Sequence, residues 1–82
     1  MPRYFFDTAD GERFHDTEGT DLKDDAAARL EAAAVLAEML RDRPDLLNHS
    51  QVFRIEVRDA DGVYRFCVEV VVRDTEVGKR EG

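Results

Sequence analysis

Two segments in the C-terminal half of this chain alternate apolar and polar side chains with the two-residue period of a β-strand. They cover residues 51–59 and 63–74, and Ala60-Asp61-Gly62 separates them. An Asp-Gly pair between two alternating segments is a strong hairpin signal, and it favours a two-residue type I′ loop. The segments are therefore predicted to form an antiparallel hairpin.

This loop sets the register of the hairpin. Each apolar residue of the first strand then lies opposite an apolar residue of the second, which is the arrangement that stabilises a sheet. The predicted pairs are Phe53 with Val70, Ile55 with Val68, Val57 with Phe66 and, on the other face, Arg54 with Glu69.

A second hairpin is predicted at the N-terminal end, where residues 3–8 and 12–16 flank Ala9-Asp10-Gly11. A two-residue loop here would place Phe14 opposite the charged Asp7. A three-residue loop with Gly11 in the left-handed region pairs Phe6 with Phe14 and Arg13 with Asp7 instead, so we expect the three-residue loop.

The alanine-rich segment between the hairpins predicts a helix. Asp24 is a suitable N-cap, and Arg43-Pro44 ends the helix because proline disfavours helical backbone in the residue before it. The stripe expected to face the sheet consists of Leu30, Ala33, Leu36, Ala37 and Leu40. The sheet residues expected to meet it are Tyr4, Phe6, Phe14, Phe53, Ile55, Val57, Tyr64, Phe66, Val68, Val70 and Val72.

These elements predict an α+β fold with ββαββ order, in which two hairpins form a four-stranded, mainly antiparallel sheet with one helix on one face. Two strand orders, 2-1-3-4 and 1-2-4-3, satisfy the crossover between the hairpins, and the sequence leaves both open. We expect one domain over residues 1–74 and a polar tail over residues 75–82.

Composition and charge limit the classes of function. The net charge of -7 disfavours general binding of nucleic acids, which requires Lys and Arg to neutralise phosphates. A single cysteine, Cys67, forms no internal disulfide and no cysteine-rich metal site, and the chain has no apolar run that resembles a signal peptide or a membrane span. We therefore expect a cytoplasmic protein without a membrane association, a cofactor or a metal.

Several segments carry a family resemblance. They are Met1-Pro2-Arg3-Tyr4-Phe5-Phe6, Asp10-Gly11, Asp16-x-Glu18-Gly19-Thr20-x-Leu22 and Asp24-x-Ala26-Ala27-Ala28-Arg29-x-Glu31-Ala32. Together they resemble a family of short bacterial proteins classed as a domain of unknown function. The resemblance implies a bacterial cytosolic setting and supplies no activity or catalytic residue.

The predicted outer face of the sheet is the main candidate surface. It carries Arg3, Arg13, Arg54, Arg58, Arg65 and Arg73 against Asp7, Glu56 and Glu69, so it is net basic on an acidic chain. In the predicted register Arg58 and Arg65 lie directly opposite each other, which is unfavourable unless an anion or a partner intervenes. The residues that we assign to a candidate interface are Phe5, Arg13, Arg54, Arg58, Arg65, Cys67 and Val71.

These features favour a non-enzymatic protein-interaction module that forms a homodimer or binds another protein through the sheet face or an open sheet edge. One alternative is a nucleic-acid-associated regulatory protein that uses the arginine-rich face. Another is a small metal-dependent enzyme built around Asp7, His15 and Asp16, although this spacing is not specific for a metal. No sequence motif assigns a catalytic residue.

Overall fold

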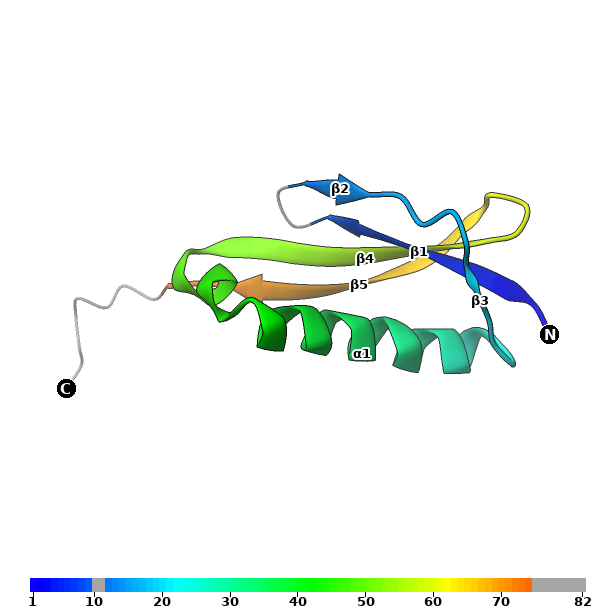
Figure 1. Cartoon of the computed structure of the whole chain (residues 1–82), viewed down its shortest axis with the longest axis horizontal. Coiled ribbons are helices and arrows are strands. Elements are labelled where there is room, and N and C mark those ends of the chain that lie inside the picture. The colour runs from blue at the N-terminus through cyan, green and yellow to red at the C-terminus, as the bar shows by residue number, and fades with distance from the viewer. Residues whose placement is uncertain (10–11, 75–82) are drawn as a thin grey trace.

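The computed structural model describes residues 1–9 and 12–74, and it shows one long helix lying along one face of an antiparallel sheet (Figure 1). The elements are β1 (Arg3–Ala9), β2 (Arg13–Phe14), β3 (Thr20–Asp21), α1 (Asp25–Asp42), the 3₁₀-helix η1 (Pro44–Asn48), β4 (Gln51–Asp59) and β5 (Tyr64–Val72). This arrangement confirms the predicted α+β fold. The predicted tail, residues 75–82, lies outside the described residues.

The strand order is β2-β1-β4-β5, and all these pairs are antiparallel. It corresponds to the 2-1-3-4 order, one of the two that the sequence left open. A short additional strand, β3, pairs with the beginning of β1. The long strand β4 thus lies inside the sheet, and β5 forms one of its edges.

The ends of α1 follow from its flanking residues. The side chain of Asp24 accepts a hydrogen bond of 2.9 Å from the backbone N–H of Ala27, so Asp24 is the N-cap as predicted. The helix ends at Asp42, and Pro44 begins η1. In η1, Leu46 folds back into the core.

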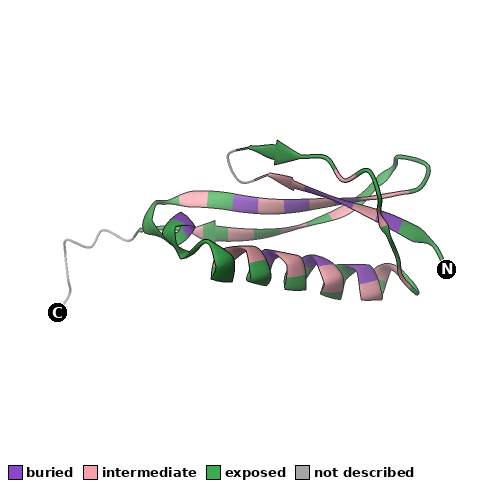
Figure 2. Cartoon of the chain, in the orientation of Figure 1, coloured by how far each residue is buried: buried purple, intermediate pink, exposed green. Residues whose placement is uncertain are grey.

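The core lies between α1 and the middle of the sheet, where β1, β4 and α1 carry the buried segments that are purple in Figure 2. Phe53, Ile55 and Val57 on β4 are fully buried, because strands flank β4 on both sides and α1 covers its inner face. The other buried apolar residues are Tyr4, Phe6, Ala28, Ala32, Leu36 and Leu46. The inner residues of β5 are only half-buried.

The helix is rotated from its predicted orientation. Leu36 is buried as expected and Leu40 is half-buried, but Leu30 is 75% exposed and Ala33 and Ala37 are exposed. Ala28 and Ala32 contact the sheet instead. Apolar residues occur all round this helix, so periodicity alone supports two orientations, and the one with alanines at the contact lets helix and sheet approach closely.

The hairpin of β4 and β5 has the predicted register over most of its length, from Val57 opposite Phe66 to Phe53 opposite Val70. The predicted two-residue loop is wrong. The Asp59 N–H donates to the Val63 carbonyl and the Gly62 N–H to the Asp59 carbonyl, which encloses a three-residue loop. Gly62 has a φ of 84°, and no described non-glycine residue has a positive φ, whereas a type I′ loop requires one at Asp61.

The side chain of Asp59 explains this turn. Its carboxylate accepts hydrogen bonds from the backbone N–H groups of Asp61 and Val63, at 2.9 Å and 3.0 Å. Aspartate commonly stabilises a turn by bonding to the backbone two residues later. The loop therefore closes one residue earlier than the Asp-Gly signal indicated.

The earlier closure leaves one extra residue on β5. Arg58 lies opposite Tyr64, so the ladder has a β-bulge at Arg65 before the regular pairing begins. Two expectations are therefore wrong: Tyr64 is not a core residue, and Arg58 and Arg65 do not lie opposite each other. Tyr64 reaches the outer face, and Arg65 reaches Asp25 at the beginning of α1.

The predicted register of the first hairpin is also wrong. Thr8 lies opposite Phe14 and Ala9 opposite Arg13, so Phe14 does not meet Phe6 and is 62% exposed. Arg13 consequently does not pair with Asp7. The expected left-handed conformation at Gly11 lies outside the described residues.

The rotated helix yields a stability prediction. We expect Leu36→Asp to unfold the protein, because an unpaired buried carboxylate costs several kcal/mol, comparable with the whole stability of a small domain. Leu30→Asp introduces the same charge at an exposed site and should change the free energy of unfolding by less than about 1 kcal/mol. Urea denaturation of both variants tests this, and equal losses would contradict the observed helix orientation.

Candidate functional site

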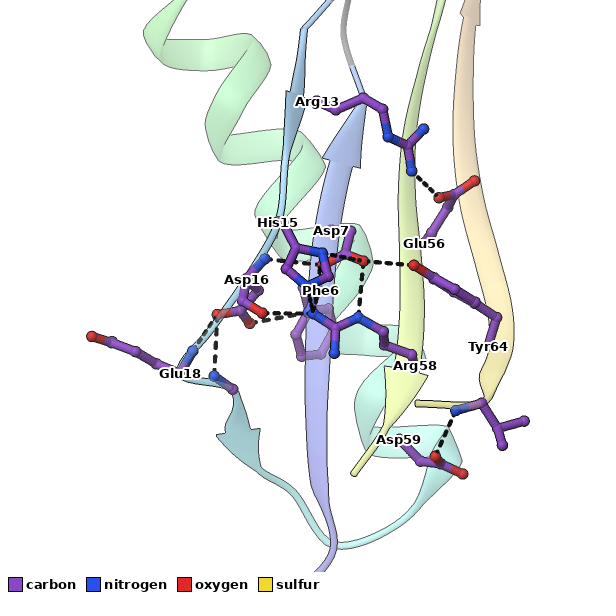
Figure 3. Close-up of polar contacts among 12 residues, drawn as sticks. Phe6, Asp7, Arg13, His15, Asp16, Glu18, Glu56, Arg58, Asp59 and Tyr64 are labelled. Carbon is purple, nitrogen blue, oxygen red and sulfur yellow. Dashed lines mark hydrogen bonds and ion pairs between the residues drawn. The ribbon is translucent and has the colours of Figure 1, made fainter. Parts of the chain in front are cut away.

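The outer face of the sheet is organised around one buried carboxylate, Asp7 on β1, which is only 3% exposed (Figure 3). Its partners come from three other segments. Arg58 on β4 donates from Nε to Oδ2 at 3.0 Å and from Nη2 to Oδ1 at 3.1 Å. The Tyr64 hydroxyl donates to Oδ2 at 3.0 Å, and the Asp16 backbone N–H donates to Oδ1 at 2.9 Å.

Arg58 makes further contacts with other residues of the same cluster. Its Nη2 donates to the Asp16 carbonyl oxygen at 2.6 Å and lies 3.0 Å from Nε2 of His15. Its guanidinium lies 4.8 Å from the ring centre of Phe5, a favourable cation–π distance. The Arg58 side chain is only 12% exposed, so this pair is largely removed from water.

The electrostatics of the cluster favour an ionised Asp7. Burial raises the pKa of its carboxyl, but the hydrogen bonds from Arg58, the Asp16 backbone and Tyr64 lower it more, so the pKa is about 2 instead of 3.8. The hydrogen bond to Asp7 raises the pKa of the Tyr64 hydroxyl. Both oxygens of Asp7 accept hydrogen bonds from donors of the same chain, and these bonds hold the carboxylate in its ionised form.

Asp16 covers the edge of β1 that faces away from β4. Its Oδ2 accepts from the Phe6 N–H at 3.0 Å, where a neighbouring strand would otherwise bond, and its Oδ1 accepts from the N–H groups of Glu18 and Gly19. Burial raises the pKa of Asp16, but these backbone donors lower it more. Gly19 has a φ of 75°, and a Cβ there would lie 2.9 Å from the Phe5 ring, so only glycine fits this turn.

The structure brings together Asp7, His15 and Asp16, the three residues considered for a metal-dependent enzyme. His15 is exposed, and its Nδ1 lies 3.4 Å from Asp7. Within residues 1–9 and 12–74, however, no three His, Cys, Asp or Glu side chains are placed to hold a metal ion. The cluster as it stands fixes strands and a loop in place, and Arg58 occupies the carboxylate that a metal would need.

The other arginines of the candidate interface are also paired with acids of their own chain. Arg13 donates to Glu56 at 2.9 Å and Arg54 to Glu69 at 2.8 Å on the outer face. Arg65 is turned toward the helix and donates to Asp25 at 3.2 Å. The basic face that the sequence suggested is thus largely neutralised within the chain.

The remaining interface candidates lie on the outer face of β5. Cys67 is an exposed free thiol opposite Glu56, and Val71 is 48% exposed opposite the similarly exposed Val52. An open depression of about 420 Å³ is lined by Arg13, Glu56, Tyr64, Arg65, Phe66 and Cys67. Sequence reasoning missed Tyr64 as a member of this face because a one-residue bulge reverses its direction.

The outer edge of β5 presents unpaired backbone groups. Three hydrogen bonds establish which backbone groups of β4 and β5 point toward each other. The Asp59 N–H donates to the Val63 carbonyl, and the Asp74 N–H donates to the Ser50 side chain beside the beginning of β4. The Phe6 N–H on β1 points away from β4 and bonds to Asp16. Because backbone direction alternates along a strand, the N–H and C=O groups of Cys67, Glu69 and Val71 point away from β4. Within the described part of the chain, no strand pairs with that edge.

A family model described as "Domain of unknown function (DUF6894)" matches residues 3–72. No curated protein and no solved structure matches the chain. In the part of the chain that the structure describes, no helix has both the length and the apolar character needed to cross a membrane.

The lowered pKa of Asp7 predicts a pH-dependent contribution to stability. Its pKa is lower in the folded chain, so the contribution is complete above about pH 4 and is lost as the pH falls toward 2. At pH 5, Asp7→Asn should cost about 3 kcal/mol because it leaves Arg58 buried without its counter-ion. Between pH 5 and pH 2 the wild type loses on the order of 2 kcal/mol of stability as Asp7 is protonated, so its advantage over Asp7→Asn shrinks by that amount.

Urea denaturation of the wild type and Asp7→Asn at both pH values measures the difference. Asp45→Asn is the control, because Asp45 pairs with Arg43 in an exposed contact and should matter by less than about 1 kcal/mol at pH 5. A constant difference between wild type and Asp7→Asn from pH 5 to pH 2 would contradict the lowered pKa.

Proposed function

Because the chain belongs to the DUF6894 family, a domain of unknown function, we propose a function from its surfaces: it is a protein-interaction module that binds an extended strand along the open edge of β5. Main-chain hydrogen bonds at a sheet edge provide affinity in this mode of recognition, and alternate side chains provide specificity. We place this binding in the bacterial cytoplasm, where the single cysteine stays reduced.

The observation that carries the proposal is the length of the unprotected edge. Between Phe66 and Val72, β5 contains no proline, lysine or arginine, which are common devices that block edge pairing. Its one charged residue, Glu69, is bonded to Arg54 on the outer face. The seven residues from Phe66 to Val72 can therefore pair with another strand, and no charged side chain has to move away from the edge first.

The sheet face supports binding less well than the edge. Arg13, Arg54 and Arg58 are engaged by Glu56, Glu69 and Asp7, so few charges remain for phosphate groups. Nucleic-acid binding would have to break these pairs against a net charge of -7. This comparison favours a protein strand over a nucleic acid as the ligand.

Selection from a library of random nonapeptides against dilute, immobilised protein tests the proposal. We expect the selected peptides to slow amide hydrogen exchange at Glu69 and Val71, whose N–H groups point to the open edge. Val71→Pro removes one of these donors without breaking a bond to β4, so it should weaken peptide binding at least about tenfold.

Val71→Thr is the matched control, because it keeps the N–H group and a β-branched side chain. Thermal unfolding establishes that both variants are folded. The proposal fails if no peptide binds, if bound peptides protect other amides, or if the two substitutions have the same effect on affinity.

A further inference from the structure

We infer that the strand bound by this edge is β5 of a second copy of the chain, paired antiparallel about a twofold axis at Val71. This inference rests on the proposed function of the edge. The two sheets then form one continuous sheet with both helices on the same side, because a twofold axis perpendicular to the sheet preserves its faces.

The hydrogen-bonding pattern fits such a pairing. In this register Glu69 lies opposite the partner's Arg73, Val71 opposite the partner's Val71, and Val70 opposite the partner's Val72. The backbone N–H and C=O groups of the odd-numbered residues of β5 point to the open edge. Every pair that exchanges main-chain hydrogen bonds in this register therefore consists of two odd-numbered residues, one from each copy. About six main-chain hydrogen bonds follow, two for each bonded pair.

Charge complementarity selects this register. Arg73 is exposed and makes no ion pair or hydrogen bond with its side chain among residues 1–9 and 12–74. The Asp74 N–H still bonds to Ser50, so the chain at Arg73 continues beside the beginning of β4. Opposite charges placed directly across strands stabilise the pair, and this register makes the Glu69–Arg73 contact twice.

The neighbouring registers are less favourable. A pairing centred on Glu69 places the two Glu69 carboxylates opposite each other, and one centred on Val70 places Glu69 opposite valine. A pairing centred on Cys67 would bring Glu69 to the partner's Arg65, but the bulge turns Arg65 toward Asp25.

Burial on the inner face supports the same pairing. Val70 and Val72 are only half-buried, whereas Phe53, Ile55 and Val57 on the neighbouring strand are fully buried. Across the axis, Val70 and Val72 of each copy meet Val72 and Val70 of the partner subunit. On the outer face, the exposed Val71 meets its own symmetry mate and loses water contact.

Sedimentation equilibrium of the full chain over a range of concentrations tests the inference. We expect the wild type to be a dimer that dissociates on dilution. Arg73→Glu places two carboxylates across the axis and should raise the dissociation constant at least about tenfold. Arg73→Lys keeps the positive charge opposite Glu69 and should keep most of the wild-type affinity.

Lys23→Glu is the matched control, because it changes the net charge equally at an exposed residue between β3 and α1, at the opposite end of the helix from the proposed axis (Figure 1). It should leave the dissociation constant nearly unchanged. A wild type that stays monomeric at millimolar concentration would overturn the inference. Equal effects of Arg73→Glu and Lys23→Glu would also overturn it, as would an equal loss of affinity in Arg73→Lys and Arg73→Glu.

The two proposals fail separately. A monomeric wild type whose β5 edge still binds selected nonapeptides would overturn the self-pairing and leave strand binding in place. A monomer that binds no peptide would overturn both.

Discussion

The ion pair between Asp7 and Arg58 is the contact on which the outer half of the structure depends. Asp7 lies on β1 and Arg58 on β4, and the donors that complete the site come from Tyr64 on β5 and from the loop that contains Asp16. Removing two charges from water is costly, and the cost is offset only when hydrogen bonds satisfy the remaining oxygens and protons. Four segments must therefore be in place before this pair is stable.

The bulge in β5, which follows from the turn at Asp59, also serves this pair. A regular ladder would place Tyr64 on the core face, where its hydroxyl could not reach Asp7. The extra residue at Arg65 turns Tyr64 to the outer face and sends Arg65 to the acidic first turn of α1. One irregularity thus supplies a donor to the buried carboxylate and a cation near the helix N-terminus, where Asp25 accepts its hydrogen bond.

Much of the fold could be predicted from the sequence, because its strongest patterns are local. Alternation fixed the pairing of Val57 with Phe66, and Asp24 and Pro44 marked the limits of the helix. The errors arose where two local solutions were equally consistent: apolar residues surround α1, and the Asp59 side chain competes with Asp-Gly for control of the turn. The hairpin register predicted the Arg54–Glu69 pair. The acids that bond Arg13 and Arg58 lie 43 and 51 residues away along the chain, so only the folded sheet reveals those two pairs.

The hydrogen bond from Phe6 to the Asp16 carboxylate has a consequence for stoichiometry. A sheet with two long open sides can add copies without limit and grow into a fibre, whereas one with a single long open side stops after one addition. Here β2, Asp16 and β3 occupy the outward-facing positions of β1 in turn, and β2 and β3 have only two residues each. One carboxylate, by taking the place of a strand, thus makes any assembly through β5 finite.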